Sequence, residues 1–179
     1  MFSAIWVKTI LENNGQAHLW GTMDGNFIRN YAQRFKQTLT DQYKQDWHST
    51  IEESDRFATY KAFKQEHKRE NYLTDIKSSK QRKHLTRLRM GITEINNNQR
   101  FTSPNHPRSC PFCDDLEDEE HFLLRCPTYN RLRRQHISRH WITLNNVQYT
   151  DLLYNDNPNI LRDTAVYTIR ALALRESNM

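Results

Sequence analysis

All three cysteines of the chain lie in one short segment, and a histidine stands between the second and the third. Cys110, Cys113, His121 and Cys126 follow the spacing C-x2-C-x7-H-x4-C. Thiolates and an imidazole at such spacing are typical of a structural zinc site, in which a Cys-x-x-Cys turn and a later segment each supply two ligands. Because protein groups would fill all four positions, no water could bind. The sequence therefore predicts one structural Zn²⁺ rather than a catalytic metal.

Local sequence predicts how the ligands are presented. Cys110-Pro-Phe-Cys113 reads as a knuckle whose backbone amides hydrogen-bond the thiolates, and residues 119–125 read as a helical turn that brings His121 and Cys126 toward it. His106 is an alternative fourth ligand, but His121 is favoured because cysteines bracket it. The remaining alternative is a chance cluster of buried cysteines.

The spacer between Cys113 and His121 is strongly acidic, with six carboxylates in residues 114–120. We expect a solvated acidic loop that repels phosphate and supports the histidine ligand through its outer contacts. A catalytic carboxylate metal site is the alternative. No base or nucleophile accompanies these acids at a defined spacing, so we do not expect an enzyme.

Composition favours a mainly α-helical fold, because Leu, Lys, Arg, Gln and Glu are abundant whereas only four Gly and three Val occur in 179 residues. We expect a loosely packed segment over 1–25 and a helical domain over 26–179 that contains the small CCHC zinc knuckle at 110–126. No signal peptide or membrane-spanning run is recognised, and metal-type cysteines indicate a reducing compartment. The expected location is therefore nuclear or cytoplasmic.

A long helix is predicted from Asn26, where large apolar residues recur every four positions. We expect this stripe to pack in the core; a base-stacking surface is the alternative. Its members are Phe27, Tyr31, Phe35, Leu39, Tyr43, Trp47 and Ile51. Further helices are predicted to start near Ser54, to run over 81–90 with Gly91 as the stop, to run over 129–141, and to follow Asn157-Pro158, with a loop at 96–109.

The metal segment also resembles a known family. Cys110-Pro-Phe-Cys113, then Glu117-Asp-Glu-Glu-His-Phe-Leu-Leu124 and Cys126-Pro-Thr-Tyr129, is similar to the zinc-binding segment near the C-terminus of reverse transcriptases from non-LTR (LINE-type) retrotransposons. Weaker similarity in the flanks extends it over about residues 30–176. The resemblance covers only the C-terminal tail of a much larger protein and includes no endonuclease domain, so it implies a nucleic-acid-binding accessory module without polymerase activity.

The net charge of +5 is compatible with RNA or DNA as a partner. We expect weakly sequence-specific contacts from cationic side chains of the helices on either side of the knuckle, namely Lys80, Arg82, Lys83, Arg87, Arg89, Arg131, Arg133 and Arg134. The alternatives are solvated helix faces that pair with the 114–120 acids, a zinc-stabilised scaffold that contacts a protein such as a reverse transcriptase polypeptide, and an orphan transposon fragment without activity of its own.

Overall fold

The computed structural model of the chain describes residues 4–21, 25–64, 66–142, 144 and 147–178. The chain divides into two compact units, Met1–His48 and Ser49–Met179. The division therefore falls inside the long helix, whereas the sequence led us to expect a change in packing near residue 25. Among the described residues no strand is present, and the mainly α-helical prediction is confirmed.

The first unit contains α1 (Ala4–Asn13), the short turn η1 (Ala17–Gly21) and the first part of α2 (Gly25–Glu53). Leu11 on α1 and Leu19 on η1 are buried. The predicted long helix is thus present, and it runs on into the second unit.

The apolar stripe of α2 does not form the expected core. Tyr43 is 58% exposed and Leu39 is also exposed, whereas Ile51 is buried. Four residues turn an α-helix by about 400°, so a period-four column drifts by roughly 40° at each step and no single partner surface can follow it along the helix. The side chains of Phe27 and Tyr31 lie outside the described part of the chain.

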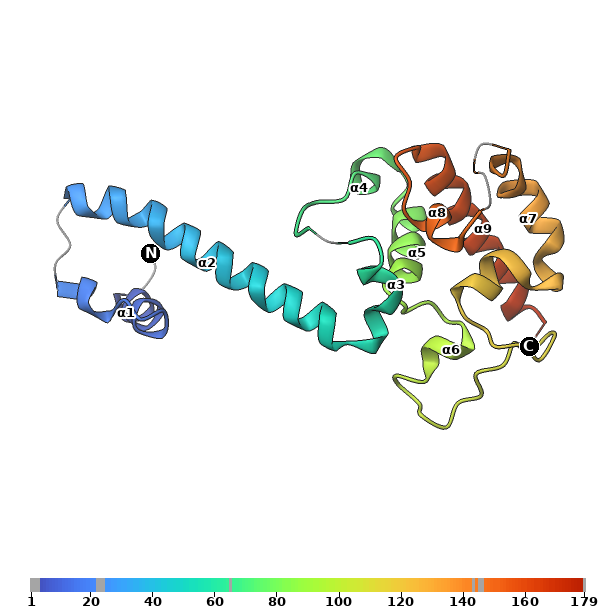
Figure 1. Cartoon of the computed structure of the whole chain (residues 1–179), viewed down its shortest axis with the longest axis horizontal. Coiled ribbons are helices and arrows are strands. Elements are labelled where there is room, and N and C mark those ends of the chain that lie inside the picture. The colour runs from blue at the N-terminus through green and yellow to red at the C-terminus, as the bar shows by residue number, and fades with distance from the viewer. Residues whose placement is uncertain (1–3, 22–24, 65, 143, 145–146, 179) are drawn as a thin grey trace. The chain divides into compact units, whose positions relative to one another are not determined.

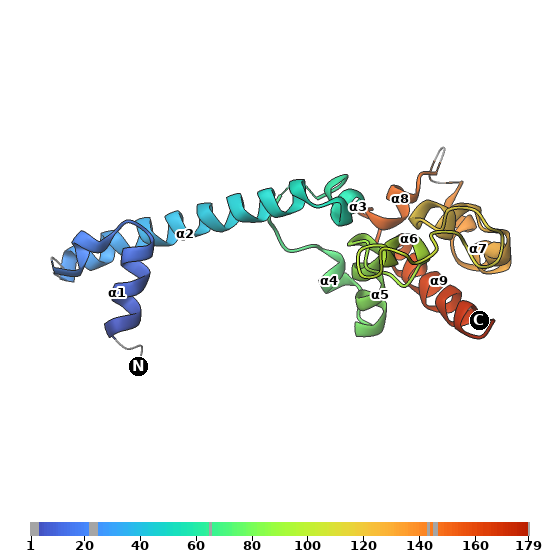
Figure 2. The same ribbon diagram turned by 90° about the horizontal axis from the view of Figure 1, so that it is seen from below.

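The second unit is built around α9 (Pro158–Glu176), which packs against α5 (Ser79–Arg89) on one side and α7 (Asn130–His136) on the other (Figure 1). The core of this unit includes Leu85 and Leu88 of α5 and Ile137 after α7. Shorter elements surround it: η2 (Asp55–Phe57), α3 (Ala58–Lys61), α4 (Tyr72–Asp75), α6 (Asn96–Gln99), η3 (His121–Arg125), η4 (Pro127–Tyr129), η5 (Ser138–His140) and α8 (Tyr149–Leu153). Figure 2 gives a second view of the same ribbon.

Local signals account for the ends of α5. The Ser78 hydroxyl accepts a hydrogen bond from the backbone N–H of Gln81 at 3.4 Å, which is the expected role of a serine cap. Gly91 follows the helix with φ +62°, a left-handed conformation that favours glycine. The predicted stop at Gly91 is therefore confirmed.

Two predictions about short segments need correction. The helix expected near Ser54 is present only as the separate turns η2 and α3. The expected loop at 96–109 contains the helical turn α6, in which Asn96 and Asn98 are buried. Both asparagines bond to carboxylates of the acidic spacer, and this long-range pairing is absent from the local pattern. None of the described helices combines the length and apolar character needed to cross a membrane.

Candidate metal centre

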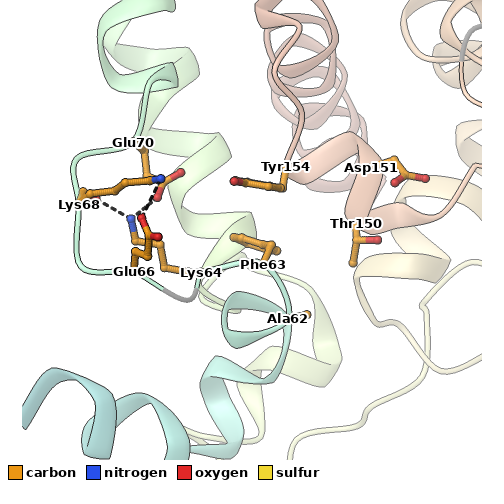
Figure 3. A pocket seen from close by; sticks show the side chains of 9 residues that line it. All are labelled: Ala62, Phe63, Lys64, Glu66, Lys68, Glu70, Thr150, Asp151 and Tyr154. Atoms are coloured by element: carbon orange, nitrogen blue, oxygen red, sulfur yellow. Dashed lines mark hydrogen bonds and ion pairs between the residues drawn. The ribbon is translucent and has the colours of Figure 1, made fainter. Parts of the chain in front are cut away.

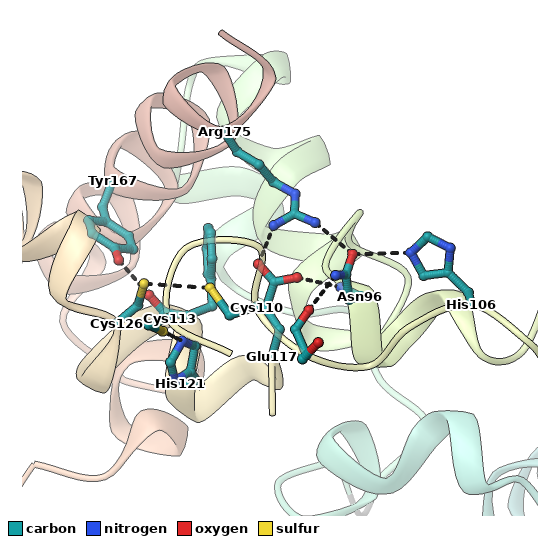
Figure 4. Close-up of polar contacts among 11 residues, drawn as sticks. Asn96, His106, Cys110, Cys113, Glu117, His121, Cys126, Tyr167 and Arg175 are labelled. Carbon is teal, nitrogen blue, oxygen red and sulfur yellow. Dashed lines mark hydrogen bonds and ion pairs between the residues drawn. The ribbon is translucent and has the colours of Figure 1, made fainter. Parts of the chain in front are cut away.

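The structure brings the four predicted ligands together. One ligand atom from each of Cys110, Cys113, His121 and Cys126 lies within 4.8 Å of the other three (Figure 4). Cys110, Cys126 and His121 are buried, and Cys113 is partly exposed. The cluster could therefore hold a metal ion with one edge close to solvent.

The spacing of the donor atoms can be compared with a tetrahedral zinc site. With Zn–S bonds of about 2.3 Å and Zn–N bonds of about 2.0 Å, two sulfurs would lie about 3.8 Å apart and a sulfur and a nitrogen about 3.5 Å apart. The Sγ atoms of Cys110 and Cys126 are 3.8 Å apart, and Cys113 Sγ lies 3.3 Å from His121 Nε2. Soft thiolates with one imidazole are ligands that suit zinc, so the donor set fits such an ion.

The knuckle is closed by its own backbone. The Asp114 N–H donates to the Cys110 carbonyl at 3.1 Å, and the Cys110 N–H donates to the Asp115 carbonyl at 2.6 Å. Asp114 takes φ 60°, a left-handed conformation that aspartate tolerates better than most residues. A single antiparallel bridge between Ser109 and Leu116 then fixes the base of the loop. The knuckle is thus a tight reversal that turns two thiols inward.

The other two ligands stand at the ends of η3, a π-helical turn. The Cys126 N–H donates to the His121 carbonyl five residues earlier at 2.8 Å, and the Asp118 carboxylate accepts from the His121 N–H at 2.7 Å. The wider π turn places a residue five positions on near the first one. His121 and Cys126 therefore face the knuckle together, as the sequence led us to expect.

Two side chains from α7 and α9 hold this turn. Arg133 donates to the carbonyls of Leu123 and Cys126 at 2.8 and 2.9 Å. The Tyr167 hydroxyl donates to the Phe122 carbonyl at 2.5 Å. Because these carbonyls belong to a turn too short to satisfy them itself, the two helices supply the missing donors.

The acidic spacer is anchored rather than uniformly solvated. Glu117 is fully buried and forms an ion pair with Arg175 at the end of α9. Its carboxylate also accepts from the Asn96 N–H at 2.6 Å. The Asn96 side chain in turn accepts from Arg175 at 2.7 Å and meets His106 Nε2 at 3.1 Å (Figure 4).

Two expectations about this segment are therefore corrected. Glu117 and Glu119 are buried and hydrogen-bonded, so only part of the spacer is a solvated acidic face. Among the described His, Cys, Asp and Glu side chains, the cluster that could hold a metal contains His121 and not His106. His106 belongs instead to the network around Asn96. Asn96 and Arg175 lie 21 and 58 positions from Glu117 in the sequence, and no local sequence pattern predicts contacts over such separations.

Burial dominates the protonation of the ligands. It raises the pKa of the Cys110 thiol to about 12 and also raises the pKa of Cys126, although backbone hydrogen bonds from Phe112 and Thr128 act in the opposite direction. Burial lowers the pKa of His121. Its Nδ1 faces the Asp115 carboxylate at 3.9 Å, which leaves Nε2 directed at the cluster. A metal ion would thus displace protons from the thiols but none from a neutral imidazole.

Two of the predicted nucleic-acid contacts are buried. Arg89 lies inside the second unit, where it pairs with Glu70 at 3.0 Å and packs over the ring of Tyr72. Arg133 is buried against the η3 carbonyls. Neither guanidinium can meet a phosphate in this structure, so the expectation that both face solvent is wrong. Helix periodicity alone does not distinguish an exposed arginine from one that satisfies buried acceptors.

The other predicted cations are at least partly accessible. Lys80 and Lys83 are exposed on α5, and Arg131 and Arg134 are exposed on α7. Arg82 donates to the carbonyls of Ile76 and Lys77, and Arg87 pairs with Glu94 at 2.7 Å. The structure therefore leaves two short cationic stretches, on two helices that both pack against α9.

Comparison of the chain with protein-family models, with curated proteins and with solved structures gave no significant match.

Proposed function

We propose that the chain is a zinc-stabilised, nucleic-acid-binding accessory module, similar to the tail of a non-LTR retrotransposon reverse transcriptase. Cys110, Cys113, His121 and Cys126 would hold one Zn²⁺. The ion would act as a cross-link that fixes the knuckle to η3 and, through η3, to α7 and α9. Protein donors occupy the four positions of such a site, so its role would be structural.

The observation that carries nucleic-acid binding is a group of like charges on α5. Lys80, Lys83 and Arg87 surround His84, and the pKa of His84 is lowered first by burial and then by these three cations. Lys80 and Lys83 make no ion pair with any described residue. Arg87 is paired with Glu94, whereas Lys80 and Lys83 repel one another, so a polyanion that neutralises these two lysines stabilises the folded surface.

This surface would bind phosphates rather than read bases. Each neutralised phosphate releases counterions, so affinity would fall steeply with salt and depend little on sequence. The exposed part of the acidic spacer, including Asp114 and Asp115, would repel the same backbone. The metal segment would therefore position α7 and α9 and leave the contacts to the cationic stretches.

Fluorescence anisotropy with single-stranded RNA and duplex DNA at several salt concentrations tests this proposal. Replacing Lys80 and Lys83 by Gln should weaken binding and reduce the slope of log affinity against log salt by roughly two. The matched control replaces Lys36 and Lys44, two exposed lysines of α2, and should leave the slope unchanged. Titrations of the wild-type chain that stay flat at low salt would contradict the proposal.

A protein-interaction scaffold is a second candidate, favoured by exposed apolar side chains. Leu39 and Tyr43 are exposed on α2, and Ile142 is 91% exposed beside the exposed Trp141. A partner that covers such apolar side chains removes them from water, which favours association. A reverse transcriptase polypeptide is the partner implied by the resemblance. Light scattering that shows a monodisperse monomer with no binding of a hydrophobic dye would argue against this candidate.

A further inference from the structure

A hollow of about 440 Å³ lies in the second unit, away from the metal cluster (Figure 3). One side is formed by the segment that follows α3 and the other by α8 and the residue after it. Its lining residues are Ala62, Phe63, Lys64, Glu66, Lys68, Glu70, Thr150, Asp151 and Tyr154. The volume lies in the range of small-molecule sites, about 300–1,000 Å³.

One wall of the hollow is aromatic. The rings of Phe63 and Tyr154 are nearly parallel, with centroids 5.6 Å apart and planes 11° apart. Tyr154 is 47% exposed, so its ring is accessible from solvent. Figure 3 shows the two rings one above the other at the hollow. Each ring covers one face of the other, so a planar ligand would stack on the exposed Tyr154 ring, with little loss of side-chain entropy because Phe63 already packs against it.

The aromatic wall is supported from behind by a buried cation. The Arg89 guanidinium lies 4.7 Å from the centre of the Phe63 ring and 5.8 Å from that of Tyr154. Glu70 neutralises it and also pairs with the buried Lys64. One carboxylate thus serves both cations, and these buried ion pairs are in place before any ligand arrives.

The charged part of the lining offers hydrogen-bonding groups without excess charge. Lys68 pairs with Glu66 at 2.9 Å, and Lys64 pairs with Glu70. The five charged lining residues sum to −1, from two lysines and three carboxylates including Asp151, and Arg89 behind them brings the local sum to zero. Such a lining offers a phosphate no net electrostatic attraction, whereas an uncharged ring with donors and acceptors on its edge can hydrogen-bond to both the lysines and the carboxylates.

A smaller hollow of about 110 Å³ adjoins the first and shares Lys68, Glu70 and Tyr154 with it. It adds Arg69, which is exposed and makes no ion pair with any described residue, and the carboxylates of Asp75 and Asp156 also line it. A cation at the rim, next to an aromatic wall, is the arrangement by which proteins hold an unpaired base together with its phosphate.

We propose that the larger hollow binds a nucleobase, stacked on the aromatic wall of Phe63 and Tyr154, with its phosphate at Arg69. The base can belong to a free mononucleotide or to an unpaired position of a single strand. The second source rests on the proposed nucleic-acid-binding function. Paired bases in a duplex present no free face and would be excluded.

Photocrosslinking tests the site directly. Single-stranded RNA that contains iodinated uridine is irradiated with the full-length chain, and crosslinked peptides are identified by mass spectrometry. Attachment at Tyr154 or Phe63 is expected. Uridine monophosphate in excess competes if the base alone is recognised, and an iodinated duplex of the same sequence should not crosslink there.

Binding to Tyr154 variants gives a second readout. Tyr154→Leu should weaken single-strand binding roughly tenfold, whereas Tyr154→Phe, which keeps the ring, should bind like wild type. Tyr43→Leu is the matched control at another exposed tyrosine. Arg69→Gln should weaken oligonucleotide binding and lower its salt slope by roughly one.

The outcomes separate the two proposals. Binding that depends on Lys80 and Lys83, without crosslinks at the aromatic wall and without an effect of Tyr154→Leu, overturns the base site alone. Mononucleotide binding that depends on Tyr154, without oligonucleotide binding, supports the base site and contradicts the proposed nucleic-acid-binding function. Absence of binding to every probe contradicts both.

Discussion

Replacing Arg175 by Met removes the cation that neutralises Glu117. The Glu117 carboxylate is fully buried and would keep only the Asn96 N–H as a partner. Breaking a buried pair by removing one member costs about 3–5 kcal/mol. Burial already raises the pKa of Glu117, so proton uptake would relieve part of this cost. We therefore expect the free energy of unfolding to fall by about 3 kcal/mol at neutral pH.

Thermal unfolding followed by circular dichroism, with both proteins saturated with zinc, measures this loss. For a chain of this size about 3 kcal/mol corresponds to a Tm lower by roughly 6–12 °C. Arg170→Met is the matched control, because Arg170 is exposed on the same helix and its hydrogen bond among the described residues is to His136 at 3.1 Å. Its cost should stay within about 0.5 kcal/mol.

The pH dependence gives this prediction a defined sign. Glu117 has a raised pKa, so the folded state binds its proton more tightly than the unfolded state does, and stability falls as pH rises through the folded pKa. Without Arg175 the folded pKa rises further. The deficit of Arg175→Met should therefore shrink as pH is lowered toward the ordinary carboxyl range. A deficit below about 1 kcal/mol, or one that grows on acidification, would refute the role assigned to the pair.

Two other substitutions test the second unit. Gly91→Ala should lower the free energy of unfolding, measured in urea, by at least about 2 kcal/mol, because φ is +62° and the added Cβ would lie 2.6 Å from the Arg56 carbonyl oxygen. Unchanged stability would contradict this close approach. Burial raises the pKa of Glu70, but Lys64 and Arg89 outweigh it and hold that pKa below its ordinary value. Glu70 thus stabilises the fold above its unfolded pKa and loses this effect as pH falls. Glu70→Gln should therefore lower the free energy of unfolding by about 3 kcal/mol at neutral pH, and the stabilities of variant and wild type should converge in acid. A stability difference that does not depend on pH would contradict this.

The sequence predicts the parts of this structure that rest on local chemistry. The four metal ligands can be predicted because a metal site needs particular side chains at short spacing. The helix stop at Gly91 can be predicted because such a stop needs a residue in the left-handed conformation. The length of α2 follows from its helix-forming composition. Each of these signals is contained within a few turns of chain.

Contacts between distant segments could not be predicted in this way. Glu117 and Arg175 are 58 residues apart, and their pairing reverses the expectation of a solvated acid. Helix periodicity would also assign Arg133 to solvent, yet its guanidinium donates hydrogen bonds to carbonyls of a π turn. The sequence does not predict that this turn is a π turn. Charged residues are buried when a specific partner compensates them, and that partner is a property of the tertiary fold.

The central claim is that one zinc ion holds the knuckle to η3, and native mass spectrometry of the purified chain tests it most directly. One bound zinc is predicted for the wild-type protein. Cys113→Ser should lose the ion together with the helical signal of the second unit, because the binding energy of a structural zinc is folding energy. A folded wild-type chain that carries no metal, in buffer supplied with zinc, would contradict the account.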